Sequence, residues 1–366
     1  MLSFNVAAAS ALIPSVARTF GTDPFLAGKI IWLYMLPYGV AALLYGPLAR
    51  SVNCKRILLY CSGAFALANA LAAFASNIQL LFAARILAGI SGAAIIPISL
   101  ILIARTSSFE ERGRKVGGFF SFTFISSLSG LFLSGLLFWR WIFFLPAVGA
   151  SLVCYAIYRH FPRIPFRIEK KIRFGYLQAL SKKHIWRLFV YIFLISFFYH
   201  GVRQWLGVYF SRIYGFEQFI ISMLLTTISL SGVFGESLGG VLSDQFGRIK
   251  IINIGASLML FALVLLLLKA NLFFLFVIMF IWGIGWTFNH AAVSTSLTDL
   301  PRNYLYESTS LNSSVRFLSG GLGAVCGGML AKISFNLEFT IFAFSLLALL
   351  LFSQQLIIKE ARNGKH

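Results

Sequence analysis

Polar side chains that can bind ligands or carry protons interrupt the long apolar runs of this 366-residue chain. In the run "FFYHGVRQWLGVYF", Arg203 and Gln204 follow His200 by three and four residues, so the three share one face of a helix. A charge at the centre of a bilayer costs about 2.5–3.5 kcal/mol, so each such group is expected to face protein or a wet cavity. The predicted substrate-binding set is His200, Arg203, Gln204, Trp286, Asn289, His290, Asn312 and Arg316.

Glu236 is the clearest acidic side chain inside an apolar run. It lies eight residues before Asp244, hence about 12 Å deeper along the same helix, where a carboxyl can carry a proton. A fixed salt bridge between Glu236 and Arg316 is an equally open interpretation. Arg203 and Arg85 can instead extend to the lipid headgroups, and the two histidines can make ordinary core hydrogen bonds or act as proton sites.

A polar junction, "GGVLSDQFGR" at 239–248, separates two apolar runs. Its glycines allow a neighbouring helix to approach closely. Asp244 can cap the start of another helix at its positive dipole end, and Arg248 can pair with it one turn later. We interpret the junction as a conformational latch. The alternative is a surface turn whose ion pair contributes about 0–1 kcal/mol.

The chain contains a weak internal repeat. At a shift of 194 residues, Gly46 falls on Gly240 and Gly89 falls on Gly283. Weak self-similarity of two halves is typical of transporters built from structural repeats.

The first copy of the junction, "YGPLARSVNCKR" at 45–56, departs from the second. Arg50 stands where the acid belongs, Asn53 replaces a glycine and Cys54 replaces the arginine. The same latch cannot form there, and Arg50 is expected to reach Glu110 or Glu111 instead. The predicted gating set is Gly240, Asp244, Gly247, Arg248, Gly46 and Arg50.

Composition predicts the fold class. The chain is 59% hydrophobic and 11% charged, with a mean hydropathy of +0.85. Its uncharged runs recur about every 30 residues and can each cross a hydrocarbon core, which takes about 20 helical residues. Only helices or closed barrels satisfy their backbone in lipid, and the alternating ten-residue strands of a barrel are not seen. An all-α polytopic membrane protein is predicted.

Other classes are disfavoured by where the charges and thiols fall. The net charge of +20 lies between apolar runs, so no nucleic-acid partner is expected. Cys54, Cys61, Cys154 and Cys326 lack metal-like spacing. No nucleophile elbow or phosphate loop is visible, so we expect neither an enzyme nor a cofactor.

Twelve membrane spans are predicted in two six-helix bundles. The bundles are 1–160 and 186–366, joined by a basic cytoplasmic linker at 161–185. The first run begins at Met1 without the basic flank of a signal peptide, so it is expected to be a span. The spans are 2–19, 25–49, 57–76, 79–104, 116–138, 141–160, 186–210, 218–243, 249–268, 271–296, 308–331 and 337–358.

The distribution of basic residues predicts the orientation. With both ends of the chain in the cytoplasm, 22 of the 31 Lys and Arg residues lie inside, as the positive-inside rule requires. A multi-pass protein of the cell (cytoplasmic or inner) membrane with cytoplasmic termini is expected. Its expected partners are membrane lipids and a small-molecule substrate, and a monomer is predicted.

Three motifs together resemble the major facilitator superfamily. They are Gly-Val-Leu-Ser-Asp-Gln-Phe-Gly-Arg at 240–248, Arg-Ile-Leu-Ala-Gly-Ile-Ser-Gly at 85–92 and Trp-Arg-Trp-Ile-Phe-Phe at 139–144. The third looks like the drug:proton antiporter-like branches. The resemblance covers the whole chain in span number, halves and loop placement.

The resemblance implies a cavity lined by the first, fourth, seventh and tenth spans. It also implies that the latch favours the outward-facing state and that Arg85 takes part in proton handling or gating. Two departures stand against proton-driven export. Leu131 replaces the proline that the antiporter branches carry in the fifth span, and Asn5 is the only strongly polar group in the first.

The expected function is proton-coupled export of a drug-like or amphipathic compound by alternating access, with the proton gradient as energy source. Tyr34, Trp205 and Trp286 suit such a substrate. The alternative is an importer or exchanger of an anionic metabolite, in which Arg316 holds the substrate. A membrane receptor or scaffold on the same fold is a third class.

Overall fold

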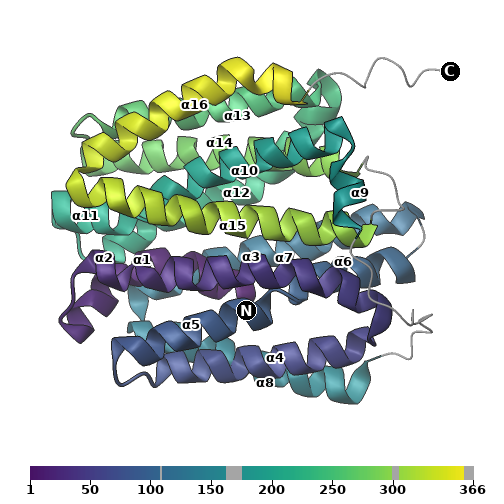
Figure 1. The fold of residues 1–366 in the computed structure, drawn as a ribbon. Helices are drawn as coiled ribbons and strands as arrows, with labels where there is room; N and C mark the ends of the chain where they lie inside the picture. The colour runs from purple at the N-terminus through teal and green to yellow at the C-terminus, as the bar shows by residue number, and fades with distance from the viewer. Residues whose placement is uncertain (108, 162–174, 299–304, 358–366) are drawn as a thin grey trace.

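The computed structural model is all-helical over the residues that it describes, which are 1–107, 109–161, 175–298 and 305–357. Figure 1 shows the helices running along a common direction. They are α1 (Leu2–Phe20), α2 (Pro24–Ala27), α3 (Lys29–Ser51), α4 (Cys54–Ala73), α5 (Ile78–Gly92), α6 (Ile95–Thr106), α7 (Phe109–Leu136), α8 (Trp139–His160), α9 (Tyr176–Leu180), α10 (Lys183–Arg203), α11 (Leu206–Tyr214), α12 (Gln218–Phe246), α13 (Arg248–Leu266), α14 (Leu272–Thr298), α15 (Leu305–Ile333) and α16 (Phe335–Ile357).

Helices occupy all twelve predicted spans. In the described part of the chain, ten helical segments are long and apolar enough to cross a membrane. The first and fifth spans, α1 and α7, are not among these ten. Helix α7 begins with the charged stretch "FEERGRK", and its described part includes the apolar segment Phe122–Leu136.

Two groups of helices lie one above the other in Figure 1, with α1–α8 in the lower group and α10–α16 in the upper group. We call them the first half and the second half. Both use the same close contact between helices. A Cβ on Gly89 would overlap the carbonyl oxygen of Tyr34, and a Cβ on Gly283 would overlap that of Ile228. The 194-residue shift relates both pairs, so the repeat is present in the packing.

The halves meet chiefly where α3 packs on α15, α7 on α12 and α1 on α11, with smaller contacts of α6 with α15 and of α1 with α12. The small residues at 130–135 supply part of the α7 contact. Ser134 Oγ lies 3.0 Å from Ser222 Oγ across the halves, while Gly130 lies against the backbone of Phe4 within the first half. Close packing therefore persists although the proline is absent.

The seventh span is broken between α10 and α11 at Trp205. Its backbone N–H bonds to the carbonyl of Val202 at 3.0 Å, a tight turn that interrupts the α-helical pattern. The indole N–H donates to the carbonyl of Ala324 at 2.8 Å. The ring fills the space that side chains on Gly28 and Gly328 would need. At 3% exposure, Trp205 joins the two halves instead of facing a cavity.

The segment joining the halves contains α9, which packs against α10 and α15 of the second half and makes a hydrogen bond to the first half. The hydroxyl of Tyr176 donates to the carbonyl of Leu43 at 2.5 Å. Residues 162–174 lie outside the described part of the chain. The boundaries at 160 and 186, and the cytoplasmic side of this segment, remain predictions.

Candidate functional site

Helices α12 and α14 approach closely because small residues line their contact. A Cβ on Gly235 would overlap Oγ1 of Thr287, whose hydroxyl instead donates to the carbonyl of Gly283 at 2.9 Å. Gly239 likewise lies against Phe288 and Ala291. This approach brings two polar side chains of facing helices to hydrogen-bonding distance.

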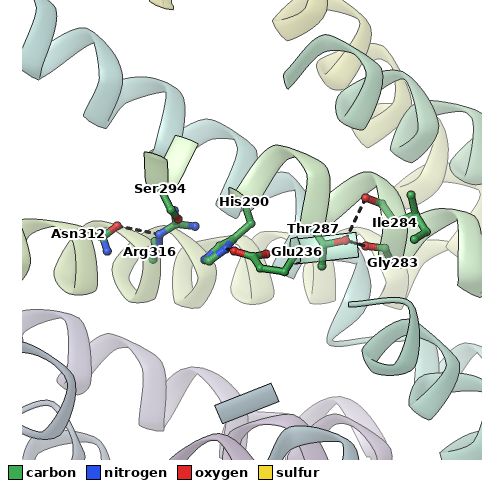
Figure 2. Close-up of polar contacts among 8 residues, drawn as sticks. All are labelled: Glu236, Gly283, Ile284, Thr287, His290, Ser294, Asn312 and Arg316. Carbon is green, nitrogen blue, oxygen red and sulfur yellow. Dashed lines mark hydrogen bonds and ion pairs between the residues drawn. The ribbon is translucent and has the colours of Figure 1, made fainter. Parts of the chain in front are cut away.

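These two side chains are Glu236 on α12 and His290 on α14. Oε1 of Glu236 lies 2.7 Å from Nδ1 of His290 (Figure 2). The side chains are 25% and 20% exposed, so neither is sealed in the core. Oε2 of Glu236 is buried without a hydrogen-bond partner among the described residues. Both side chains are of types that can bind and release a proton.

Arg316 on α15 lies beside this pair. Figure 2 shows Asn312, Arg316, His290 and Glu236 following one another in a row, with Ser294 next to Arg316. The Nε of Arg316 donates to Oδ1 of Asn312 at 2.8 Å, and its Nη2 lies 3.4 Å from Oγ of Ser294. Glu236 is close enough to interact with Arg316 electrostatically, but the direct partners of Glu236 and Arg316 are His290 and Asn312. We call Glu236, His290, Ser294, Asn312 and Arg316 the central cluster.

Aromatic rings cover one side of the central cluster. Trp286 stacks on Tyr199 with ring centroids 3.9 Å apart and planes 9° apart. His200 and His290 each lie 5.8 Å from Trp286. Nδ1 of His200 is 3.1 Å from Nε2 of Gln204. Three further residues of the predicted set, Trp286, His200 and Gln204, therefore lie beside the central cluster.

Two members of the predicted substrate-binding set are turned elsewhere. The amide of Asn289 donates to the hydroxyl of Tyr191 at 2.8 Å and to the carbonyl of Ile252 at 2.9 Å, and it is 1% exposed. Arg203 is 6% exposed and interacts with Tyr199. The contacts of Asn289 tie α14 to α10 and α13, and Arg203 lies next to the aromatic stack instead of among the headgroups.

Arg85 lies in the core of the first half, 1% exposed. Its Nε donates to the carbonyl of Ile30 at 2.9 Å, and its Nη1 donates to Oδ1 of Asn5. The amide of Asn5 in turn donates to Oδ1 of Asn69 at 2.7 Å, and the guanidinium lies 4.4 Å from the ring centroid of Tyr34. Neutral groups thus replace the acid that the resemblance implies for the first span.

The junction at 239–248 has the expected backbone but not the expected ion pair. Gly247 joins α12 to α13 with φ +89°, a conformation that disfavours other residues. Asp244 is exposed. Within the described residues the ion pairs join Arg50 with Glu307, Arg212 with Asp23 and His290 with Glu236. In this conformation Asp244 and Arg248 do not form the predicted latch pair. Gly240 has open space where a side chain would lie.

The first junction is held by a contact that the sequence analysis missed. Nη2 of Arg50 on α3 lies 2.9 Å from Oε2 of Glu307 on α15, and Glu307 is only 2% exposed. Gly46 is buried in the same helix as Arg50. The side chains of Glu110 and Glu111 lie outside the described residues, so the expected contact with them stays a prediction.

Residues of the joining segment cover the Arg50–Glu307 pair. A Cβ on Gly175 would lie 2.8 Å from Oε1 of Glu307. Burial raises the pKa of Tyr176 to about 12, so its hydroxyl remains a donor to Leu43 at neutral pH. Nothing in the local sequence singled out Glu307 or Tyr176, because their partners lie more than 130 residues away in the chain.

The apolar helices, the two halves and the polar cluster within the second half are the features of a polytopic membrane transport protein. Comparison with known proteins supplies the family. The chain matches the Major Facilitator Superfamily over residues 1–324 and again over 221–362. It belongs to the Major Facilitator Superfamily and is an integral, multi-pass membrane transporter.

Individual relatives are distant. The uncharacterised MFS-type transporter YbcL of Bacillus subtilis is 22% identical over 332 residues, which cover 88% of this chain and 84% of that protein. Multidrug resistance protein 3 of the same organism is 22% identical over 372 residues, covering 82% and 72%. The structure of the human organic anion transporter MFSD10 (TETRAN) superposes with a TM-score of 0.75 over 98% of this chain and 97% of that one. At 15% identity this likeness shows the fold alone.

Proposed function

We propose that this transporter exports a small amphipathic molecule in exchange for protons. The first and second halves would rock about the central cluster, as expected for transporters built from repeats. Relatives named as multidrug resistance and sugar efflux proteins support the direction of transport. The observation that carries the proposal is the contact between Glu236 and His290.

This contact supports proton coupling because both partners change charge by binding a proton. When Glu236 is ionised, its negative charge offsets that of Arg316 nearby. Exchange requires that the substrate and the proton exclude each other: the substrate would bind while Glu236 is ionised and in contact with His290, and it would leave when Glu236 takes up a proton. Proton binding and substrate binding are thereby linked through one carboxyl group.

The proposal places proton handling in the second half. Arg85, which the family resemblance assigns to this role, has Asn5 and backbone oxygen as its hydrogen-bond partners. An arginine does not release its proton at physiological pH, and neither partner titrates. We therefore assign Arg85 to positioning α5 against α1 and α3.

Import or exchange of an anionic metabolite is the second candidate function. One observation favours it, namely that the hydrogen-bond partners of Arg316 in the central cluster are neutral oxygens. The direction of substrate transport relative to the proton gradient distinguishes export from import, and the liposome experiment described next measures it.

The test uses purified protein in liposomes with a pH-sensitive dye inside and an imposed pH gradient. Amphipathic drugs and organic anions are screened for substrate-dependent proton movement in the wild type and in Glu236→Gln. The variant keeps the size of the side chain and removes its charge. We expect substrate-driven proton flux in the wild type and its loss in Glu236→Gln.

The matched control is Glu217→Gln. Glu217 is exposed at the start of the same helix, α12, and its side chain makes no capping bond. This control should couple like the wild type. Persistence of coupled proton flux in Glu236→Gln would rule out Glu236 as the proton carrier.

A further inference from the structure

The central cluster also carries information about the charge and shape of its cargo. We propose that the transported molecule is an organic anion that bears a flat aromatic ring, with its acidic group on Arg316 and its ring beside Trp286. The inference rests on the function proposed above, because it names the substrate class of the same site.

The first argument is the unfilled hydrogen-bonding capacity of Arg316. A guanidinium presents five N–H donors in a planar fork. In the described residues its contacts are one bond to Asn312 and a longer one to Ser294. The carboxylate nearest to it, Glu236, has its direct bond with His290. The fork of Arg316 is therefore left to bind an external carboxylate, sulfonate or phosphate, the groups that it binds with two parallel bonds.

The second argument is the charge balance around the cluster. His200 lies within electrostatic reach of Arg203, Arg316 and His290. Arg203 and Arg316 are permanently charged, and against these two cations the described residues around the cluster offer one carboxyl, Glu236. Buried cations without counter-charges are costly, and an anionic ligand would supply the missing charge. A cationic cargo would add to the repulsion instead.

The third argument is the stack of rings next to Arg316 and the histidines. Tyr199 stacks on Trp286 with ring centroids 3.9 Å apart and also lies parallel to Trp282 at 5.6 Å. Trp282 is fully buried, whereas Trp286, at the other end, is only partly buried. The stack thus holds Trp286 in place, and the exposed part of its ring is available for contact with a ligand ring, a contact that aromatic rings favour.

Binding is measured without any gradient, so that it does not depend on proton coupling. The probes are tritiated 2-naphthalenesulfonate, which keeps its negative charge at every working pH, the uncharged 2-naphthamide and the cation tetraphenylphosphonium. The protein is the purified full chain, as wild type, Arg316→Gln, Arg316→Lys and Trp286→Ala. Size-exclusion profiles and melting curves verify that each variant is folded.

We expect the wild type to bind the sulfonate and to prefer it to both other probes. Arg316→Gln should weaken sulfonate binding by about 10- to 100-fold, the value of a hydrogen bond to a charged group, and leave the amide unaffected. Arg316→Lys should recover part of the loss. Trp286→Ala should weaken the sulfonate and the amide alike, by about two- to tenfold.

Three results would overturn the inference: no sulfonate binding to the wild type, stronger binding of the cation, or unchanged sulfonate affinity in Arg316→Gln. Sulfonate binding that persists in a protein without proton-coupled flux would contradict the proposed function alone. Loss of sulfonate binding together with proton-coupled flux of the cation would contradict the inference alone.

The charge of the cargo also separates export from import. Exchange of one internal monoanion for one external proton moves two charges in the same sense, so an inside-negative potential set with potassium and valinomycin should accelerate it. Import of the same anion together with one proton moves no net charge and should not respond to the potential.

Discussion

At the 194-residue shift that superposes the packing glycines of the two halves, the titratable residues of the second half fall on apolar residues of the first. Glu236 corresponds to Ala42, His290 to Ile96 and Arg316 to Phe122. The only comparable charge of the described first-half core, Arg85, corresponds in turn to Met279. The repeat has kept the close helix contacts in both halves, while the polar groups that can bind and titrate are gathered in one.

This difference indicates a division of work between the halves. In the first half, Arg85 is held by neutral groups and buried completely, as suits a rigid support. In the second half, the side chains of Glu236 and His290 stay partly exposed and can respond to protons and ligands. The following predictions test this division, from the largest expected effect to the smallest.

Valine substitutions of the repeated glycines should damage both halves equally. A side chain on Gly89 or Gly283 would overlap backbone carbonyl oxygen, so the helices must separate. Overpacking of this kind costs about 1–3 kcal/mol or more, and we expect little folded protein by size-exclusion chromatography. Gly118 is the control, since it has open space around it and its alanine variant should fold. A large difference between the two valine variants would show that the halves are not packed alike.

The ion pairs that join the halves should differ in strength. Glu307→Gln breaks a pair in which Glu307 is 2% exposed, and we expect a loss of about 3 kcal/mol in stability. Asp23→Asn breaks a pair whose partners are 45% and 44% exposed, and it should cost at most about 1 kcal/mol. Thermal melting compares the two.

Exchange of the charges provides the check on the first pair. The double variant Arg50→Glu, Glu307→Arg should regain part of the stability that Glu307→Gln loses. If Glu307→Gln and Asp23→Asn melt alike, the Arg50–Glu307 contact is no stronger than a surface pair.

Removal of the amide beside Arg85 should lower stability without changing ligand affinity. Asn5→Leu has a similar volume but leaves one donor of a buried guanidinium unpaired, which costs about 1–3 kcal/mol. The melting temperature should therefore fall. The affinity for 2-naphthalenesulfonate should stay within about twofold of the wild-type value, because Asn5 lies in the half that is not expected to bind the ligand. Lost affinity in a stably folded Asn5→Leu would place binding chemistry in the first half.

The comparison that reaches down to a few tenths of a kcal/mol concerns the two junctions, which make the same turn with different residues. Gly247 reaches it with φ +89°, whereas Asn53, its counterpart at the 194-residue shift, has φ −60° and caps α4 by accepting from the N–H of Lys55 at 2.8 Å. Gly247→Ala should cost about 1–3 kcal/mol of backbone strain. Asn53→Ala should cost about 1 kcal/mol through loss of the cap, and Asn53→Gly only a few tenths. Denaturation curves of the three variants test this order.

The sequence predicted those features that depend on local composition and spacing. Twelve apolar runs became helices, and the matching glycines became matching contacts, because hydrophobic length and side-chain volume act at each position separately. Trp286 and His290, four residues apart, share the helix face that their spacing predicts. The neighbouring Asn289 points about a quarter turn away, towards α10 and α13.

What the sequence could not predict depends on which helices become neighbours. The sequence suggested Glu110 or Glu111 as the partner of Arg50, and that contact stays a prediction. The contact with Glu307 joins residues that lie 257 positions apart, so no local pattern could point to it. The same limit applies to Trp205, whose aromatic character suggested a substrate contact. The ring is buried between Gly28 and Gly328 because of the way in which the two halves pack together, and a local sequence pattern cannot predict that packing.

The position of Trp205 has a practical consequence. A bulky ring that sits between glycines of opposite halves has to leave its slot whenever the halves part at that end, and it then meets water. Its emission should shift to longer wavelengths and become accessible to iodide quenching as the protein cycles. With Trp205→Phe as the reference for the background of the other tryptophans, the molecule carries its own optical reporter of opening.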